Sequence, residues 1–372
     1  MIYRTLAGEK VSQLGFGAMR LPQVGGKIDE KESIRMIHHA IDSGINYVDT
    51  AWVYHNGTSE DLVAKAFKGG YREKSFVATK SPVWLIEKDE DFEYYLDRQL
   101  ENLQVDCIDF YLLHALNRGT WATCKKHNAI DFCEKMVKKG KIKHFGFSFH
   151  DAHPVFIDIV DAYNWEFCQI QYNYLDRKEQ AGLAGLNYAR AKNIDIIIME
   201  PLRGGNLVEP LPETVKKLWK TAGKQCSAVE WALGWIFSRK DIGVVLSGMS
   251  TMEQLVENLA IAGANGPDCF TSEELALIDK TEELYRQNTR IGCTQCGYCM
   301  PCPSGVDIPR NFKVWNELYM FGKSETARGA WQWIDAPVRA DKCTKCGVCV
   351  SHCPQQIAIP DELANMVTDF AG

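Results

Sequence analysis

Two cysteine runs near the C-terminal end of the chain have the residue types and spacing to bind metal clusters. The runs are Cys293-Thr-Gln-Cys296-Gly-Tyr-Cys299-Met-Pro-Cys302-Pro and Cys343-Thr-Lys-Cys346-Gly-Val-Cys349-Val-Ser-His-Cys353-Pro. Three thiolates at this spacing can bind three corners of one [4Fe–4S] cube, and the fourth cysteine, before proline, normally serves the other cube. The second run has the full bacterial spacing, whereas the first is one residue short between its last two cysteines. The pattern predicts two [4Fe–4S] clusters.

The fourth ligand of each cube can be assigned in more than one way. Crossed pairing would give Cys293, Cys296, Cys299 and Cys353 to one cube, and Cys343, Cys346, Cys349 and Cys302 to the other. The shortened first run leaves this assignment open. Structural zinc is a weaker alternative because its sites usually combine separate C-x₂₋₄-C pairs. Disulfides need an oxidising compartment, and the N-terminal residues 1–6 contain no apolar signal-peptide core, so we expect a cytoplasmic protein.

A second set of chemically capable residues follows short apolar runs earlier in the chain. These residues are Asp49 and Tyr54 after one run, Lys80 after the next and His114 after a third. A tyrosine phenol has a pKa near 10 and is a poor acid at neutral pH unless a nearby cation lowers that pKa, which we expect Lys80 to do. Asp49 would hold and balance Lys80, while His114 would donate a hydrogen bond or relay a proton. Together the four side chains could protonate a carbonyl oxygen.

The elements that must position these residues alternate between strands and helices. The predicted strands are Leu14–Ala18, Tyr47–Thr50, Phe76–Thr79, Ile108–Leu113, His144–Phe147, Phe167–Gln171, Asp195–Met199 and Gly243–Leu246. The predicted helices are Lys31–Ser43, Ser59–Phe67, Asp91–Leu103, Ile130–Lys139, His153–Asp161, Glu179–Lys192, Ala228–Phe237 and Met252–Ile261. This succession predicts an α/β protein with a (β/α)₈ barrel, whose active site forms at the C-terminal strand ends. A doubly wound sheet is the alternative, but residues 15–20 lack the third glycine of its phosphate-binding turn.

The order and strand positions of Asp49, Tyr54, Lys80 and His114 resemble the catalytic tetrad of the aldo-keto reductases. The resemblance covers residues 1–285 and includes the Asp49-Thr-Ala-Trp-Val-Tyr54 motif and the Tyr-Leu-Leu-His114 segment. Residues 286–372 are similar to the small α-helical ferredoxin-like domain carried by one branch of that family. The resemblance implies a two-domain oxidoreductase that interconverts a small-molecule carbonyl and an alcohol, with Tyr54 as general acid or base.

The resemblance also implies a nicotinamide site, NAD(H) or NADP(H), in which this chain departs from the family pattern. Its residues would be Ser148, Gln171, Ser247, Gly248, Glu257 and Asn258. Phe149 stands where the family has an asparagine, Met199 where it has a stacking aromatic, and Gln254 where it has a phosphate-binding arginine. A neutral Gln254 cannot make the charge-assisted contact of an arginine, so a preference for NADP is in doubt, and NAD or a weakly held nicotinamide is the alternative, although Arg203 could supply a cation. A flavin stays an open alternative.

Two iron–sulfur clusters joined to such a barrel are compatible with several functions. The clusters could pass electrons between the barrel and a partner ferredoxin or flavodoxin, or deliver single electrons to the substrate as a ketyl radical, with Tyr54 and His114 managing protons. They could equally be structural in an ordinary nicotinamide-dependent reductase. The remaining alternative is a non-enzymatic electron carrier, but the presence of all four tetrad residues argues against it. Trp52 and Trp84 are candidates for lining a substrate pocket, with core packing as the alternative.

Composition narrows the classes of partner. The chain has 372 residues, of which 46% are hydrophobic and 24% charged, with a formal net charge of −6. No basic stripe is present to bind nucleic acid, and no apolar run is long enough to cross a bilayer. We therefore expect a soluble protein without nucleic-acid or membrane partners, and the sequence does not indicate an oligomeric state.

Overall fold

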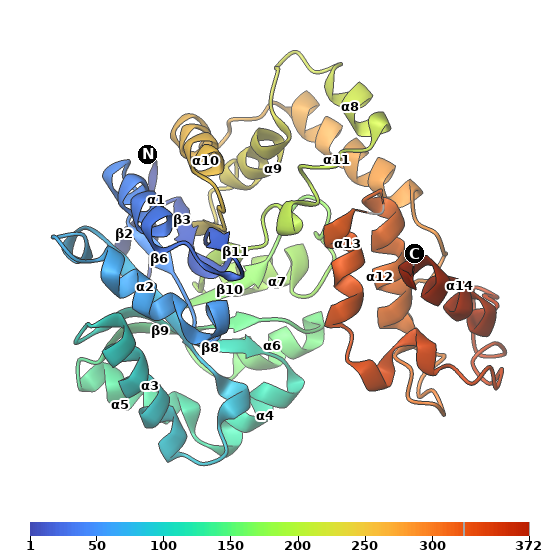
Figure 1. Cartoon of the computed structure of the whole chain (residues 1–372), viewed down its shortest axis with the longest axis horizontal. Coiled ribbons are helices and arrows are strands. Elements are labelled where there is room, and N and C mark those ends of the chain that lie inside the picture. The colour runs from blue at the N-terminus through green and yellow to red at the C-terminus, as the bar shows by residue number, and fades with distance from the viewer. Residues whose placement is uncertain (323, 372) are drawn as a thin grey trace. The chain divides into compact units, whose positions relative to one another are not determined.

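Eight parallel strands close into a barrel in the computed structural model, which describes residues 1–322 and 324–371 (Figure 1). In order around the barrel they are β3 (Leu14–Gly17), β6 (Tyr47–Asp49), β7 (Phe76–Ser81), β8 (Ile108–Leu116), β9 (Ile142–Phe149), β10 (Phe167–Gln171), β11 (Asp195–Met199) and β12 (Val244–Ser247). The closed order confirms the predicted barrel and excludes the doubly wound sheet. Every predicted strand is present, with ends that differ by a few residues.

Helices follow the strands around the outside of this barrel. They are α1 (Glu30–Asp42), α2 (Ser59–Ala66), α3 (Glu90–Leu103), α4 (Arg118–Lys126), α5 (Ala129–Lys138), α6 (His153–Asp161), α7 (Gly182–Ala191), α9 (Ala228–Phe237) and α10 (Met252–Ala264). The sequence predicted all of them except α4. Two short hairpins, β1 (Tyr3–Leu6) with β2 (Glu9–Ser12) and β4 (Gln23–Val24) with β5 (Lys27–Ile28), were also not predicted.

Local chemistry accounts for these boundaries. Asp29 caps α1 by accepting a hydrogen bond from the amide of Glu32, and acidic residues fill the first turn, where the helix dipole favours negative charge. The strands are continuous apolar runs because a parallel barrel is covered on both faces. Ile196, Ile197 and Ile198 in β11 illustrate this, since all three have no exposed surface.

The N-terminal hairpin covers the end of the barrel opposite the strand tips. Leu6 and Val11 belong to one buried cluster with Tyr47, Phe110 and Phe167, which lie in the first halves of their strands. Because this end is filled by apolar packing, the C-terminal strand ends are left to form a site.

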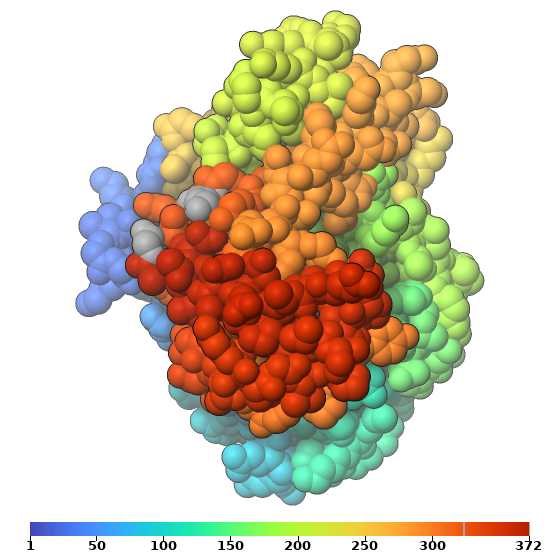
Figure 2. Space-filling view, turned by 90° about the vertical axis from the view of Figure 1, so that its right-hand side faces the viewer, coloured from blue at the N-terminus to red at the C-terminus, as the bar shows by residue number. Residues whose placement is uncertain are grey.

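A second compact unit combines residues Arg203–Ala228 with the chain from Ser272 onward, while Met1–Leu202 and Val229–Thr271 form the barrel unit. The helices of the second unit are α8 (Glu213–Trp219), α11 (Ser272–Gln287), α12 (Ile308–Met320), α13 (Glu325–Gly329) and α14 (Ile359–Ala371). Trp315 is fully buried in this unit and donates its indole N–H to Asp369 of α14 at 2.8 Å. Figure 2 shows the surface of this unit, with the end of the chain in red.

The second unit therefore includes a segment, Arg203–Ala228, that precedes the predicted domain boundary between residues 285 and 286. That boundary stays a prediction. No helix within the described residues has both the length and the apolar character needed to span a membrane.

Candidate functional site

The ammonium group of Lys80 is the centre of a buried polar cluster at the tips of β6 and β7. Its side chain has no exposed surface, and Nζ donates to Asp49 Oδ1 at 2.6 Å and to the carbonyl of Thr50 at 2.8 Å. The same Nζ lies 3.3 Å from the hydroxyl of Tyr54. Three of the four residues predicted to act together therefore share one hydrogen-bonded centre.

Tyr54 reaches this centre from a tight turn after β6. It opens the short 3₁₀ segment Tyr54–Gly57, in which His55 and Asn56 both adopt left-handed backbone conformations, with φ of 51° and 56°. Such conformations are uncommon for residues other than glycine and are frequent where backbone is constrained near functional sites. The turn leaves the Tyr54 ring edge-on to the ring of His114, with centroids 6.2 Å apart.

His114, the fourth predicted residue, lies in β8 under an aromatic cover. Trp84, in the 3₁₀ segment Val83–Leu85, packs on the imidazole with ring centroids 5.1 Å apart, yet 44% of Trp84 remains exposed. His114 Nδ1 is buried and has no hydrogen-bond partner among the described residues. The structure therefore brings all four predicted residues together beneath a partly exposed indole.

Burial dominates the ionisation of this cluster. It lowers the pKa of His114 well below 6.5, and the positive charge of Lys80 lowers that pKa further, so the imidazole is neutral at pH 7. Burial would also lower the pKa of Lys80, but the negative charge of Asp49 and the Tyr54 hydroxyl raise it above 10.5 overall. The ammonium group is therefore retained.

The pKa of Tyr54 corrects one expectation from the sequence. Burial raises the pKa of the phenol, and the opposing effect of Lys80 does not overcome it, so the pKa lies above 10. The prediction that Lys80 lowers the pKa below its ordinary value is wrong for the protein alone. The physical reason is that a buried phenolate loses its hydration, which the sequence does not reveal.

Two residues predicted for the nicotinamide site, Ser148 and Gln171, have free hydrogen-bonding capacity that matches a carboxamide group. Ser148 is buried and accepts from the amide of Ala115 at 2.7 Å, while Gln171 donates to Asp176 at 2.7 Å and accepts from Gln180 at 2.8 Å. A serine hydroxyl can still donate, and a glutamine oxygen can accept a second bond. A carboxamide offers the complementary carbonyl and NH₂ groups. The two side chains lie on neighbouring strands and share a face, so they fit this group.

The four residues predicted after strand β12 fall into two groups. Asn258 donates to Ser247 at 2.8 Å, and both side chains are buried, so they tie α10 to the strand tip. Gly248 is exposed at the rim, where the Arg20 side chain packs against its α-carbon, and Glu257 is half-buried on α10. Gln254, at the arginine position of the family, accepts a hydrogen bond from the amide of Ser250 at 2.8 Å and so stabilises the loop itself.

Two arginines that could bind a cofactor phosphate differ in how tightly they are held by an acidic partner. Arg203 forms an ion pair with Glu317 at 2.7 Å inside the second unit, where both side chains are largely buried, so it is already committed. Arg20, which was not predicted, follows β3 in the 3₁₀ segment Ala18–Arg20 and lies 3.9 Å from Glu200. Its place directly after the first strand, like that of the polar residues after the later strands, is the signal in the sequence that indicates it.

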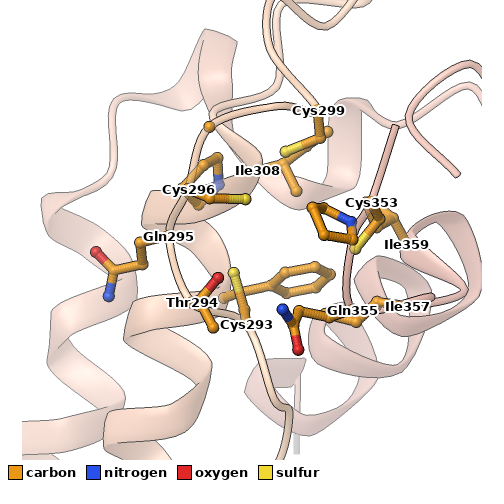
Figure 3. A pocket seen from close by; sticks show the side chains of 14 residues that line it. Cys293, Thr294, Gln295, Cys296, Cys299, Ile308, Cys353, Gln355, Ile357 and Ile359 are labelled. Atoms are coloured by element: carbon orange, nitrogen blue, oxygen red, sulfur yellow. The ribbon is translucent and has the colours of Figure 1, made fainter. Parts of the chain in front are cut away.

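Four of the predicted cluster ligands converge on one pocket. Cys293, Cys296 and Cys299 from the first run and Cys353 from the second turn their sulfur atoms toward a common space (Figure 3). The pocket encloses about 320 Å³, part of it open to solvent, and Ile308, Phe312 and Ile359 are among its apolar walls. This is the crossed set of cysteines, with the fourth member coming from the other run.

The remaining four cysteines form the complementary group. Burial raises the pKa of Cys349, and the neighbouring thiolates of Cys302, Cys343 and Cys346 raise it further, so these three side chains lie within electrostatic reach of Cys349. Over residues 1–322 and 324–371 no group of three or more His, Cys, Asp or Glu side chains is arranged to hold a single metal ion.

The two runs adopt the same local backbone. Gly297 and Gly347 have φ values of +76° and +75°, and each carbonyl accepts a hydrogen bond from the amide three residues later. Such a turn requires the left-handed region, which glycine adopts without strain. In both halves a Cys-Pro pair then precedes a helix that begins with Ile-Pro, α12 in the first and α14 in the second. The second unit therefore contains an internal structural repeat with one cysteine run in each half.

Comparison with known proteins matches each part of the chain to a family. Residues 13–283 match the aldo/keto reductase family, and residues 292–358 match the 4Fe-4S dicluster domain. Among curated relatives, L-galactose dehydrogenase of Arabidopsis thaliana is 28% identical over 280 residues, covering 68% of this chain and 85% of the relative. The NADH-specific methylglyoxal reductase of Escherichia coli is 26% identical over 303 residues, covering 69% and 92% of the two chains.

Solved structures show the same likeness. The aldo-keto reductase AKR11C1 of Bacillus halodurans, in its holo form, aligns with a TM-score of 0.64 and 26% identity over 76% of this chain and 96% of its own. An aldo-keto reductase of Klebsiella pneumoniae in complex with NADPH shares the fold, with a TM-score of 0.60 and 21% identity over 75% of this chain and 95% of its own. The chain therefore belongs to the aldo/keto reductase family and carries a 4Fe-4S dicluster domain at its C-terminal end.

Proposed function

We propose that the barrel interconverts a carbonyl and an alcohol with Tyr54 as general acid or base, and that two [4Fe–4S] clusters carry electrons to or from that reaction. The observation that supports the catalytic role most directly is the buried ammonium of Lys80, which contacts both Asp49 and the Tyr54 hydroxyl. A proton donor next to a fixed buried cation suits a reaction in which negative charge develops on oxygen.

In the reducing direction the Tyr54 hydroxyl donates its proton to the carbonyl oxygen. The phenolate that remains is stabilised by Lys80, 3.3 Å away, whose own charge is balanced by Asp49. The neutral imidazole of His114 donates a second hydrogen bond to the same oxygen, a role that its lowered pKa favours. In the oxidising direction Tyr54 accepts the proton instead.

A nicotinamide, held through its carboxamide by Ser148 and Gln171, would supply or accept the hydride. Trp84 borders the same space with an exposed face, which suits a small carbonyl compound with a planar or apolar substituent. Gln254 offers no charge to a 2′-phosphate, and this favours NAD(H) over NADP(H).

The electron-carrying role rests on the two cysteine sets. We assign one cube to Cys293, Cys296, Cys299 and Cys353, and the other to Cys302, Cys343, Cys346 and Cys349. Each cube exchanges one electron, so two cubes match the two electrons of a hydride. Residues 294–296 and 344–346 are exposed, so each cube would lie near the surface, where an external ferredoxin or flavodoxin can exchange electrons. A flavin that splits the electron pair stays the open alternative.

A structural role for the clusters is the second candidate. It is favoured by the walls of the first cysteine pocket, where Ile308 and Phe312 of α12 face Ile359 of α14. A cube in this pocket would fill space between two helices of the second unit and hold them together. The two roles differ in whether the clusters change redox state during turnover.

The catalytic proposal is tested by Tyr54→Phe in protein purified anaerobically with its iron. Tyr94→Phe, a change at an exposed tyrosine of α3, is the matched control. With NADH, NADPH and a panel of aldehydes and ketones, Tyr54→Phe should lower kcat by about 10²–10⁴-fold, the usual contribution of a general acid, while the control keeps full activity. Undiminished turnover by Tyr54→Phe with intact cluster absorbance would contradict the assignment.

A further inference from the structure

Arg20 stands at the rim of the barrel between the catalytic turn and the loop after β12. The amide of Leu21 donates to His55, the neighbour of Tyr54, at 3.2 Å, which fixes the backbone after Arg20 to the catalytic turn. On the other side Ser250 donates its hydroxyl to the carbonyl of Arg20 at 2.8 Å. Arg20 is thereby held between two segments that carry predicted site residues.

The side chain of Arg20 lies over Gly248. A β-carbon placed at Gly248 would come within 3.1 Å of three carbons of the Arg20 side chain, so the absence of one allows the arginine stem to rest on the strand tip. The guanidinium group extends beyond this contact, and the side chain as a whole remains 45% exposed. A glycine at position 248 therefore allows the Arg20 side chain to lie across the rim of the barrel.

The partner of Arg20 is a weak one. Glu200 lies 3.9 Å away, at the outer limit of an ion pair, and its own side chain is 32% exposed. An exposed pair at this distance contributes little to stability and is exchanged readily. Glu200 adopts a left-handed backbone conformation, with φ of 54°, and its carbonyl accepts from Asn173 at 3.1 Å. Its charge also raises the pKa of Tyr54, as the smallest of several contributions after burial, so Glu200 lies within electrostatic reach of the reacting hydroxyl.

The surroundings of Arg20 favour a phosphate as its ligand. The thirteen-residue helix α10 begins just after this loop, with Thr251 as its cap, so its positive end lies on the same segment as Gly248 and Ser250. Loops after the seventh and eighth strands of (β/α)₈ barrels frequently bind phosphate. Gln254 and Arg203 are engaged elsewhere, which leaves Arg20 as a cation available beside this loop.

We propose that Arg20 binds the diphosphate of a nicotinamide dinucleotide, and that Glu200 competes with the diphosphate for the same guanidinium group. The diphosphate joins the nicotinamide, which must reach Tyr54, to the adenosine, and Arg20 lies between the Tyr54 turn and the N-terminus of α10. This inference rests on the proposed nicotinamide dependence and adds a residue that the family pattern in this chain did not indicate.

The test is direct binding of NADH and of ADP-ribose to the anaerobically purified holoprotein by isothermal titration calorimetry. ADP-ribose contains the diphosphate without the nicotinamide, so it reports on Arg20 separately from Tyr54. Arg20→Gln should weaken both ligands about 10–100-fold, as expected for loss of charge-assisted hydrogen bonds. Glu200→Gln should strengthen both about 2–5-fold, because a weak competitor is removed. Arg98→Gln, at an exposed arginine of α3 that pairs with Glu101, should change neither.

Three outcomes would overturn the proposal in distinguishable ways. If the unaltered protein binds NADH and ADP-ribose but Arg20→Gln binds them equally well, the assignment of Arg20 is wrong and the proposed function stands. If Arg20→Gln weakens only a carboxylate-bearing substrate, Arg20 contacts the substrate and the diphosphate assignment is wrong. If the unaltered protein binds neither NADH, NADPH nor ADP-ribose, both the inference and the nicotinamide dependence fail.

Discussion

The buried pair between Lys80 and Asp49 makes a quantitative prediction for the substitution Asp49→Asn. This change keeps the shape of the side chain but removes the counter-charge of an ammonium group that has no exposed surface. Breaking a buried ion pair from one side usually costs about 3–5 kcal/mol, because the remaining charge is neither hydrated nor paired. We therefore expect Asp49→Asn to reduce the free energy of unfolding of the barrel by about 3 kcal/mol or more, and to reduce activity.

The pH at which the unfolding of these variants is measured must keep Lys80 charged, so it depends on the pKa of Lys80. Burial opposes the charge, but Asp49 raises the pKa of Lys80 above 10.5, so on the alkaline side the stabilisation by this pair is present up to pH 10.5 and is lost as the pH rises through the raised value. On the acid side the pair is lost when Asp49 becomes protonated. Burial raises the pKa of Asp49, against the effect of Lys80. Because Lys80 Nζ and Asp49 Oδ1 lie 2.6 Å apart and both side chains are buried, the two groups form an ion pair. The stability of the variants should therefore be compared at pH 7–8.

The assay is urea unfolding of the anaerobic holoprotein, followed by far-ultraviolet circular dichroism, with cluster absorbance recorded in parallel to separate cluster loss from barrel unfolding. The double variant Asp49→Asn with Lys80→Met removes both charges and should recover at least half of the lost stability. Asp97→Asn, which breaks the exposed pair with Lys141, is the control and should cost less than about 1 kcal/mol. A cost for Asp49→Asn no larger than that of the control, or a double variant less stable than the single one, would refute the reasoning.

Two further predictions concern the clusters and the barrel wall. The double variant Cys293→Ser with Cys353→Ser should retain about half of the iron, because the crossed arrangement places both changes in one cube. The double variant Cys343→Ser with Cys353→Ser changes one ligand of each cube and should lose nearly all of the iron. Iron analysis that gives the reverse result would show that each run binds its own cube. Gly146→Ala should destabilise the barrel by about 1–3 kcal/mol, since the new carbon would come within 2.2 Å of a carbonyl oxygen of β10. The control Gly263→Ala in α10, where the space around the glycine is open, should be neutral or stabilising. Equal unfolding midpoints for the two variants would contradict this prediction.

The barrel could be predicted from the sequence because its strands are continuous apolar runs that end in polar residues. Those same endings identified Asp49, Lys80 and His114, since parallel strands bring their C-terminal ends to one rim. Tyr54 was recognisable by its place five residues after Asp49, although the left-handed turn that carries it was not.

What could not be predicted depends on contacts between distant segments. The spacing of the cysteine runs is the same whether Cys353 serves its own run or the other, so only the fold brings it to Cys293. The net shift in the pKa of Tyr54 depends on how completely the phenol is buried. The place of Arg20 after the first strand can be read from the sequence, but its orientation depends on Gly248, which lies far away in the sequence.

The most direct test of the central claim is to mix the anaerobic holoprotein with NADH and an aldehyde in turn, and to follow nicotinamide absorbance and the electron paramagnetic resonance of the clusters together. If the clusters carry electrons, each NADH oxidised in the absence of an aldehyde should reduce two cubes by one electron each and release one proton, and an external ferredoxin or flavodoxin should reoxidise them. Steady turnover of the aldehyde with NADH while both clusters stay unchanged, before and after NADH addition, would contradict the electron-carrying role and support clusters that only hold the second unit together.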